Sequence, residues 1–123
     1  MPTGVERLKK RADFLRVAAV RRKWATPGIV LQAARDISCV DAGPLRVGFT
    51  ATKKTGNAVK RNRIKRRLRA LADEILPVHA EKGWDFVLIG RQMTPDRDYK
   101  DLKKDLLIAL KKVGALKQGV TNA

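Results

Sequence analysis

Residues 53–69, KKTGNAVKRNRIKRRLR, carry nine lysine or arginine residues and no acidic residue. A Gly-Asn pair at positions 56 and 57 interrupts this segment with a turn signal. Beyond the turn, apolar residues recur with the spacing of one helix face, at Ile64, Leu68, Leu71 and Ile75. The sequence therefore predicts a basic helix over about residues 58–75, ending before Pro77, with its apolar face turned toward a core.

The charge distribution around this helix is one-sided. All twelve acidic residues lie at or before Asp41, or at or after Asp73. The formal net charge is +16 over 123 residues, and a compact body with this charge repels itself, so a polyanionic partner is expected. Membrane-surface helices place Trp, Phe and Leu opposite their cations, whereas the apolar face here is suited to a globular core. Nucleic acid is therefore favoured over an anionic membrane.

Composition and length indicate one globular domain over residues 1–123. Hydrophobic residues make up 44% of the chain, and no apolar stretch of about 18 residues could span a bilayer. Residues from about 114 to 123 show no periodic signal and are expected to fray. Cys39 is the only cysteine, which excludes an internal disulfide and predicts a reducing, cytoplasmic location.

The first half of the chain predicts one helix and two or three strands. A helix is expected over residues 5–20, followed by a short strand near Trp24, a turn at residues 27–28 and a strand over 29–34. A further turn at 41–44 precedes a strand over 45–52. The first helix has one apolar side, formed by Leu8, Ala12, Leu15 and Ala19.

The second half completes an α+β sandwich with one small sheet. The apolar run at residues 84–89 predicts a strand covered on both faces. Asp98 is placed to cap a final helix. That helix has an apolar stripe made of Leu102, Leu106, Ala109, Leu110 and Val113.

Candidate catalytic residues are scarce. Nucleases that use protein groups need a general acid and a general base, but His79 is the only histidine and is expected in a solvated connecting segment. Neither a CxxC nor an HExxH motif occurs. Asp98, Asp101 and Asp105 lie beside lysines at helical spacing, which predicts a solvated, salt-bridged face rather than a cation site. No catalytic residue and no metal site are expected in the protein.

The basic helix has the residues of an RNA-binding surface. Arg61, Lys65 and Arg69 fall on one helical line, with Asn62 and Arg66 beside it. Arginine binds phosphate oxygens with two parallel hydrogen bonds, and asparagine bonds a base edge, a sugar or a phosphate. A merely solvated face would carry acidic partners one turn away, and this face has none.

Two aromatic residues have two interpretations each. Phe14 lies beside the apolar side of the first helix, and this pattern is more typical of a core residue than of a base-stacking platform. Trp24 either covers the edge of the sheet or contacts RNA.

The segment RVGFT at residues 46–50, followed by KKTGNAVKRNRIKRRLR, closely resembles the signature of the bacterial ribonuclease P protein subunit. The resemblance extends to Arg11-x-Asp13-Phe14 and to the strand at residues 85–89, so only about the last ten residues lie outside it. It implies an αβββαβα fold with one mixed four-stranded sheet. It also implies that the chain is a small basic protein partner of a catalytic RNA. That RNA would cleave precursor tRNA, with magnesium held mainly by the RNA.

The resemblance also implies the partners and their sites. The partners would be the catalytic RNA subunit and precursor tRNA, with no membrane and no obligate protein partner. The basic helix would contact the catalytic RNA, through Lys53, Lys54, Asn57, Arg61, Asn62, Arg63, Lys65, Arg66 and Arg69. A cleft between the first helix and the sheet would bind the single-stranded 5′ leader, through Lys10, Phe14 and Gln32. Family members often have further aromatics where this chain has Ala18 and Gln32, so Gln32 is expected to replace stacking by hydrogen bonding.

Three other functions fit parts of the pattern. A ribosomal or other structural RNA-binding protein is also small, basic and without catalytic residues. A DNA-binding architectural protein is disfavoured because no reading helix is followed by a dimerisation segment. An autonomous nuclease is disfavoured by the missing acid–base pair.

Overall fold

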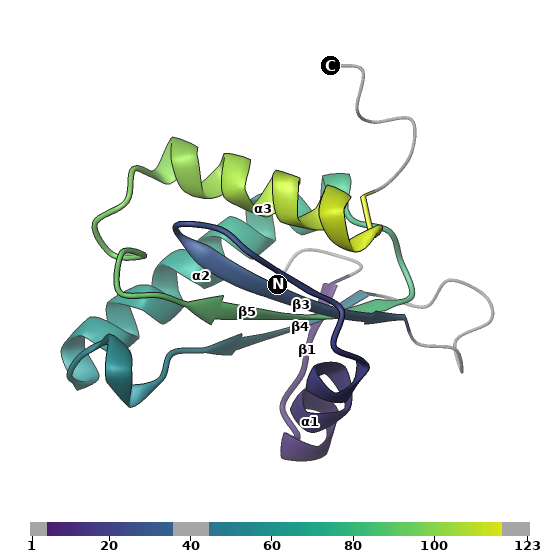
Figure 1. Ribbon diagram of the computed structural model, residues 1–123, viewed down its shortest axis with the longest axis horizontal. Helices are drawn as coiled ribbons and strands as arrows, with labels where there is room; N and C mark the ends of the chain where they lie inside the picture. Colours follow the sequence, from purple (N-terminus) through teal and green to yellow (C-terminus); the bar gives the residue numbers. More distant parts are fainter. Residues whose placement is uncertain (1–4, 36–44, 117–123) are drawn as a thin grey trace.

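A five-stranded mixed sheet lies at the centre of the computed structural model, which describes residues 5–35 and 45–116 (Figure 1). The strands are arranged in the order β1-β4-β5-β3-β2. In chain order the elements are β1 (Val5–Arg7), α1 (Arg11–Val20), β2 (Lys23–Ala25), β3 (Ile29–Arg35), β4 (Leu45–Thr50), the 3₁₀ turn η1 (Lys53–Thr55), α2 (Ala58–His79), β5 (Trp84–Gly90) and α3 (Tyr99–Val113).

The strand directions follow from the connections. The β2–β3 hairpin is antiparallel, and β3 is antiparallel to β5. The neighbours β4 and β5 are parallel and are joined through α2, as a parallel pair requires a crossover element. The predicted α+β fold is confirmed, but the sheet has five strands rather than four. The additional strand is β1, which pairs in parallel with β4 at the sheet edge.

The helices divide between the two faces of the sheet: α2 and α3 cover one face, and α1 lies on the other (Figure 1). The α2–α3 side contains the large core, to which β3, β4 and β5 also contribute. The α1 side has a small cluster of four buried residues, Leu8, Val17, Ala34 and Val87. The predicted double coverage of β5 is confirmed, because Phe86 and Leu88 lie in the large core and Val87 in the small one.

The first helix is shorter than predicted and presents a different side. Leu8 is buried, but it precedes the helix in an extended segment whose amide donates to the Val47 carbonyl at 2.9 Å. Inside α1 only Val17 is fully covered, and Leu15 is 56% exposed. The predicted apolar side of Leu8, Ala12, Leu15 and Ala19 is therefore wrong. The alanines of this helix are too small to indicate which side faces the sheet. The side that packs inward is the one that carries Val17.

The basic helix buries the predicted face, since Ile64, Leu68, Leu71 and Ile75 are all buried. It does not end before Pro77, however, but continues to His79. Proline removes one helical hydrogen bond, yet Leu76 is fully buried and its carbonyl accepts the Ala80 amide at 3.1 Å. His79 therefore belongs to the last turn of a helix, not to a connecting segment.

The final helix agrees with the prediction. Asp98 accepts the Lys100 amide at 3.3 Å, and all five residues of the predicted stripe are buried. Residues 114–116 were predicted to belong to a frayed tail but are ordered, because Gly114 ends the helix at a φ of +84° and Ala115 is fully buried. The Ala115 carbonyl accepts the Glu81 amide at 2.9 Å. The predicted turn at 41–44 and residues 117–123 lie outside the described residues.

Leu68→Ala is expected to destabilise the protein by roughly 2–5 kcal/mol, because it leaves a cavity between α2 and the sheet. Urea denaturation measures the loss. Val78→Ala, on the exposed side of the same helix, is the control and should cost less than about 0.5 kcal/mol. Equal stability of the two variants would show that the faces of α2 are wrongly assigned.

Candidate nucleic-acid interface

The basic helix starts at a tight turn that only glycine fits well. Gly56 has a φ of +142°, and a Cβ at this position would lie 2.6 Å from the Lys60 side chain. Asn57 follows as the N-cap, and its side-chain oxygen accepts the Lys60 amide at 2.9 Å. Asn57, predicted to contact RNA, thus has a structural task in the free protein. Its RNA contact stays a prediction.

Five cations of α2 lie on its outward side and have no acidic partner among the described residues. Arg63, Arg66 and Arg69 are exposed, and Arg61 and Lys65 are half-buried. Within residues 5–35 and 45–116, none of these five forms an ion pair with an acid. Their positive charge is therefore available to an external anion.

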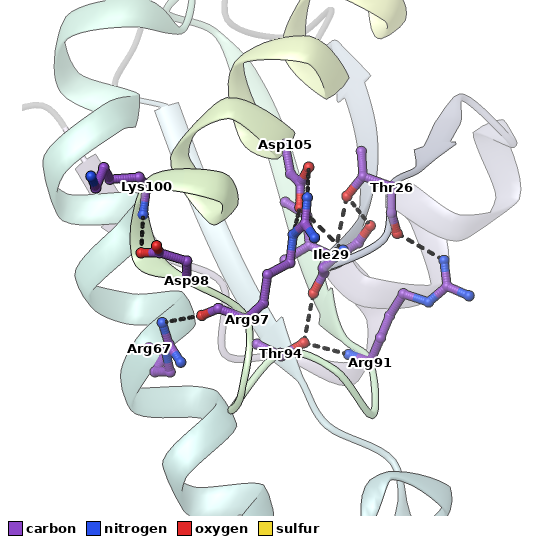
Figure 2. A network of polar contacts seen from close by, with 10 residues as sticks. Thr26, Ile29, Arg67, Arg91, Thr94, Arg97, Asp98, Lys100 and Asp105 are labelled. Atoms are coloured by element: carbon purple, nitrogen blue, oxygen red, sulfur yellow. Dashed lines mark hydrogen bonds and ion pairs between the residues drawn. The ribbon is translucent and has the colours of Figure 1, made fainter.

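Arg67 differs from the other cations of the helix. Its guanidinium donates to the Arg97 carbonyl at 2.7 Å (Figure 2). It also donates to the Pro95 carbonyl at 2.6 Å, in the same loop before α3. This arginine therefore fastens α2 to the β5–α3 loop. It was not among the predicted RNA-binding residues, and the structure gives it a scaffolding role.

The same loop is held from its other side by a buried carboxylate. Arg97 donates to Asp105 at 2.7 Å, and this hydrogen bond raises the pKa of the Arg97 guanidinium. Asp105 also accepts the Gly28 amide at 3.1 Å, and Thr94 donates to the Gly28 carbonyl at 2.6 Å (Figure 2). The prediction that Asp105 lies on a solvated face is wrong, because this residue is buried, with 4% of its surface accessible, and its carboxylate is bonded to Arg97 and Gly28.

A hollow of about 460 Å³ lies on the exposed side of α2. Its lining residues are Val59, Asn62, Lys65, Arg66 and Arg69. Four of the nine residues predicted to bind RNA thus share one concave surface. Lys54 is exposed on η1, outside this hollow, and the side chain of Lys53 lies outside the described part of the structure.

A second surface lies across the sheet, next to α1. The half-buried Phe14 ring covers Gly48, where an added Cβ would lie 2.5 Å from two ring carbons. Gly48 pairs with Val87, and Val87 pairs with Gln32, so these residues form one row across three strands. With about 4.8 Å between strands, Gln32 lies about 10 Å from Gly48 on the same face.

The other residues predicted for this surface lie on α1. Lys10 is exposed and forms the N-cap of α1, so it lies one turn before Phe14. Ala18 is exposed one turn after Phe14. The structure thus brings Phe14 and Gln32 to the same face of the sheet and puts Lys10 at its margin. Leader binding by these three residues stays a prediction.

A buried carboxylate connects α1 to the sheet. Asp85 is 1% exposed and accepts two hydrogen bonds from Arg46 on the neighbouring strand, at 2.8 and 2.7 Å. Arg16 of α1 also donates to Asp85. This ion pair was not predicted from the sequence, although Asp85 is a lone acid within the apolar run at residues 84–89 and is the sequence signal for it.

Comparison with known proteins gives the family. The sequence model of the family described as Ribonuclease P matches residues 3–114. The chain belongs to the ribonuclease P family.

Individual relatives agree with this assignment. The chain is 56% identical to the ribonuclease P protein component of Paramagnetospirillum magneticum, over 96% of this chain and 90% of that protein. It is 32% identical to the ribonuclease P protein component of Clostridium botulinum, over 88% and 94%. Among solved structures, the RNase P protein of Staphylococcus aureus matches with a TM-score of 0.72 at 30% identity, over 90% of this chain and 97% of that chain. The Thermotoga maritima RNase P protein matches with a TM-score of 0.68 at 27% identity, over 84% and 93%.

Membership of the ribonuclease P family has a direct consequence for partners, because the relatives are named protein components and this name implies an RNA component. The fold, the family, and the α2 cations that have no acidic partner among the described residues all agree with an RNA partner. No helix among the described residues is long and apolar enough to cross a membrane.

Asp85→Asn is expected to lower the free energy of unfolding by about 1–3 kcal/mol, because Arg16 and Arg46 lose the charge of their shared acceptor. The measurement is urea denaturation. Asp13→Asn is the matched control: its carboxylate lies 3.9 Å from Arg16 and is more exposed, so the loss should stay below about 1 kcal/mol. If both variants lost the same stability, Asp85 would not be the group that holds α1.

Proposed function

We propose that this chain is the RNA-binding protein subunit of ribonuclease P. In this function it binds the catalytic RNA and the 5′ leader of precursor tRNA. It thereby assists the magnesium-dependent endonucleolytic removal of the leader, which gives the mature tRNA 5′ end in the cytoplasm. The observation that carries the proposal is the exposed side of α2, whose five outward cations have no acidic partner among the described residues.

The chemistry of α2 suits a folded RNA. Arginine forks match phosphate oxygens in pairs, and each phosphate that is neutralised releases condensed counterions. The N-terminal turn of the helix adds the positive end of its dipole near the same residues. Because α2 is fixed to the sheet by its apolar face and to the β5–α3 loop by Arg67, the cations are positioned before the RNA binds.

The surface beside α1 suits the single-stranded leader. An aromatic ring such as that of Phe14 offers a stacking face to an unpaired base. Gln32 offers an amide with both a donor and an acceptor on the same face of the sheet, and Lys10 offers a cation at the margin. A leader that crosses this face would contact the protein, whereas mature tRNA has no such segment.

The proposal assigns the chemical step to the RNA. Magnesium prefers carboxylate oxygens, and among residues 5–35 and 45–116 no group of three or more His, Cys, Asp or Glu could hold a metal ion. The proposal places magnesium mainly on the RNA, as the family resemblance implies, and gives no residue of this chain a catalytic role. The single histidine, in the last turn of α2, remains outside the mechanism.

The experiment that tests the proposal is precursor-tRNA cleavage by a transcribed bacterial ribonuclease P RNA at low magnesium, with and without this protein. We expect the protein to accelerate cleavage, because its cations offset phosphate repulsion that magnesium otherwise screens. Protein free of RNA should leave the substrate intact, and His79→Ala should not change the rate. Cleavage by the protein alone would refute the assignment of chemistry to the RNA.

Phe14→Ala should weaken holoenzyme affinity for a precursor with a leader of several nucleotides by roughly 1–3 kcal/mol, because one base loses its stacking partner. Affinity for mature tRNA should hardly change. Phe14→Leu keeps the apolar packing against Gly48 but removes the aromatic face, so it separates stacking from folding. Binding curves for both ligands at matched salt are the measurement. Equal losses on the two ligands would identify Phe14 as a core residue.

A further inference from the structure

Val59 is the most exposed large hydrophobic side chain in the described part of the protein, with 76% of its surface accessible. It lies in the first turn of α2, next to the cations proposed to bind RNA. A β-branched residue gives a helix no propensity advantage, and this side chain contributes nothing to the core. The fold alone therefore does not explain an apolar residue at this position.

A single exposed valine is ordinary on a protein surface, so its surroundings decide its meaning. Val59 lines the hollow of about 460 Å³ on α2, and the other lining residues are polar or cationic: Asn62, Lys65, Arg66 and Arg69. Asn62 and Arg66 follow Val59 at i+3 and i+7, so the three share one side of the helix. The hollow thus joins one apolar contact, one amide and three positive charges.

We propose that this hollow receives one unpaired nucleotide of the RNA partner, with Val59 against the base or its ribose. Asn62 bonds the base edge, and the cations hold the flanking phosphates. This inference rests on the proposed function, which requires phosphate binding by α2 but no contact to a base. It adds Val59 to the binding surface and gives the surface a contact that does not depend on charge.

The composition of the hollow favours a nucleotide over a bare phosphate. Phosphate binding needs only cations and amide donors, whereas reading a nucleotide adds hydrogen bonds and apolar contacts to the base. In double-stranded RNA the base faces are stacked and out of reach, so the nucleotide must be unpaired.

The test compares salt dependence for Val59→Thr and Arg66→Ala, with a transcribed bacterial ribonuclease P RNA as the probe. Threonine keeps the β-branched shape but places a hydroxyl in the apolar contact. Val59→Thr should weaken RNA affinity about tenfold at every salt concentration, the effect of losing one buried valine contact, without changing the salt slope. Arg66→Ala should instead reduce the slope by about one unit.

Val78→Thr is the matched control, because Val78 is a half-exposed valine on the same helix but outside the hollow. It should bind the RNA like the wild type. Inorganic polyphosphate, a polyanion without bases, is the second probe. Val59→Thr should bind polyphosphate as the wild type does, whereas Arg66→Ala should bind it less well.

The outcomes separate this inference from the proposed function. If Val59→Thr binds RNA like Val78→Thr while Arg66→Ala loses affinity, the nucleotide contact is refuted and phosphate binding by α2 stands. An equal loss by Val59→Thr on RNA and on polyphosphate also refutes the contact, because no base is involved. If the wild type and Arg66→Ala bind the RNA equally, the proposed function of α2 fails.

Discussion

The burial of one face of α2 against the sheet is the constraint on which both the core and the basic surface depend. Ile64, Leu68 and Leu71 are fully buried against the sheet. Ile64 packs directly on Gly90 of β5, where only glycine fits because an added Cβ would lie 2.2 Å from the Ile64 side chain. This close contact fixes the rotation of the helix about its axis. The rotation in turn decides which side of α2 carries the cations outward, so the core face and the proposed RNA-binding surface are two sides of one helix.

The buried acids of the described residues pair with arginines of the scaffold and not with the outward cations of α2. Asp85 forms ion pairs with Arg16 and Arg46. Asp105 forms one with Arg97. These buried carboxylates therefore neutralise arginines that hold neighbouring elements together. The outward cations of α2 receive none. Local neutralisation in the scaffold therefore leaves the outward cations of α2 among the charges of the protein that are not neutralised.

Prediction from the sequence succeeded where a strong local pattern agreed with the final packing. The stripes of α2 and α3 consist mainly of leucine, isoleucine and valine at helical spacing, and their buried faces were predicted correctly. The pattern failed for α1, where alanines left the inward side undecided, and for β1, whose three residues are too few to show alternation. The proline rule placed the end of α2 too early because it ignores the burial of Leu76.

The candidate site was predictable only in part, for a related reason. Residue type and spacing identified the outward cations, but the role of Arg67 depends on two carbonyl groups about thirty residues away. The position of Asp105 likewise depends on Gly28, 77 residues earlier in the chain. Such contacts leave no periodic trace in the sequence. The hollow beside Val59 is a property of the assembled surface and has no sequence signal of its own.

The unequal size of the two cores has a consequence for dynamics. The α1 side rests on a cluster of four buried residues and on Asp85, whereas α2 and α3 share the large core. Local opening costs least where few apolar contacts must break, so amide hydrogens of α1 should exchange with solvent before those of α2. The protein thus combines a rigid face with a compliant one. A compliant face can adjust to single strands of different sequence, which is what the proposed binding of precursor-tRNA leaders requires.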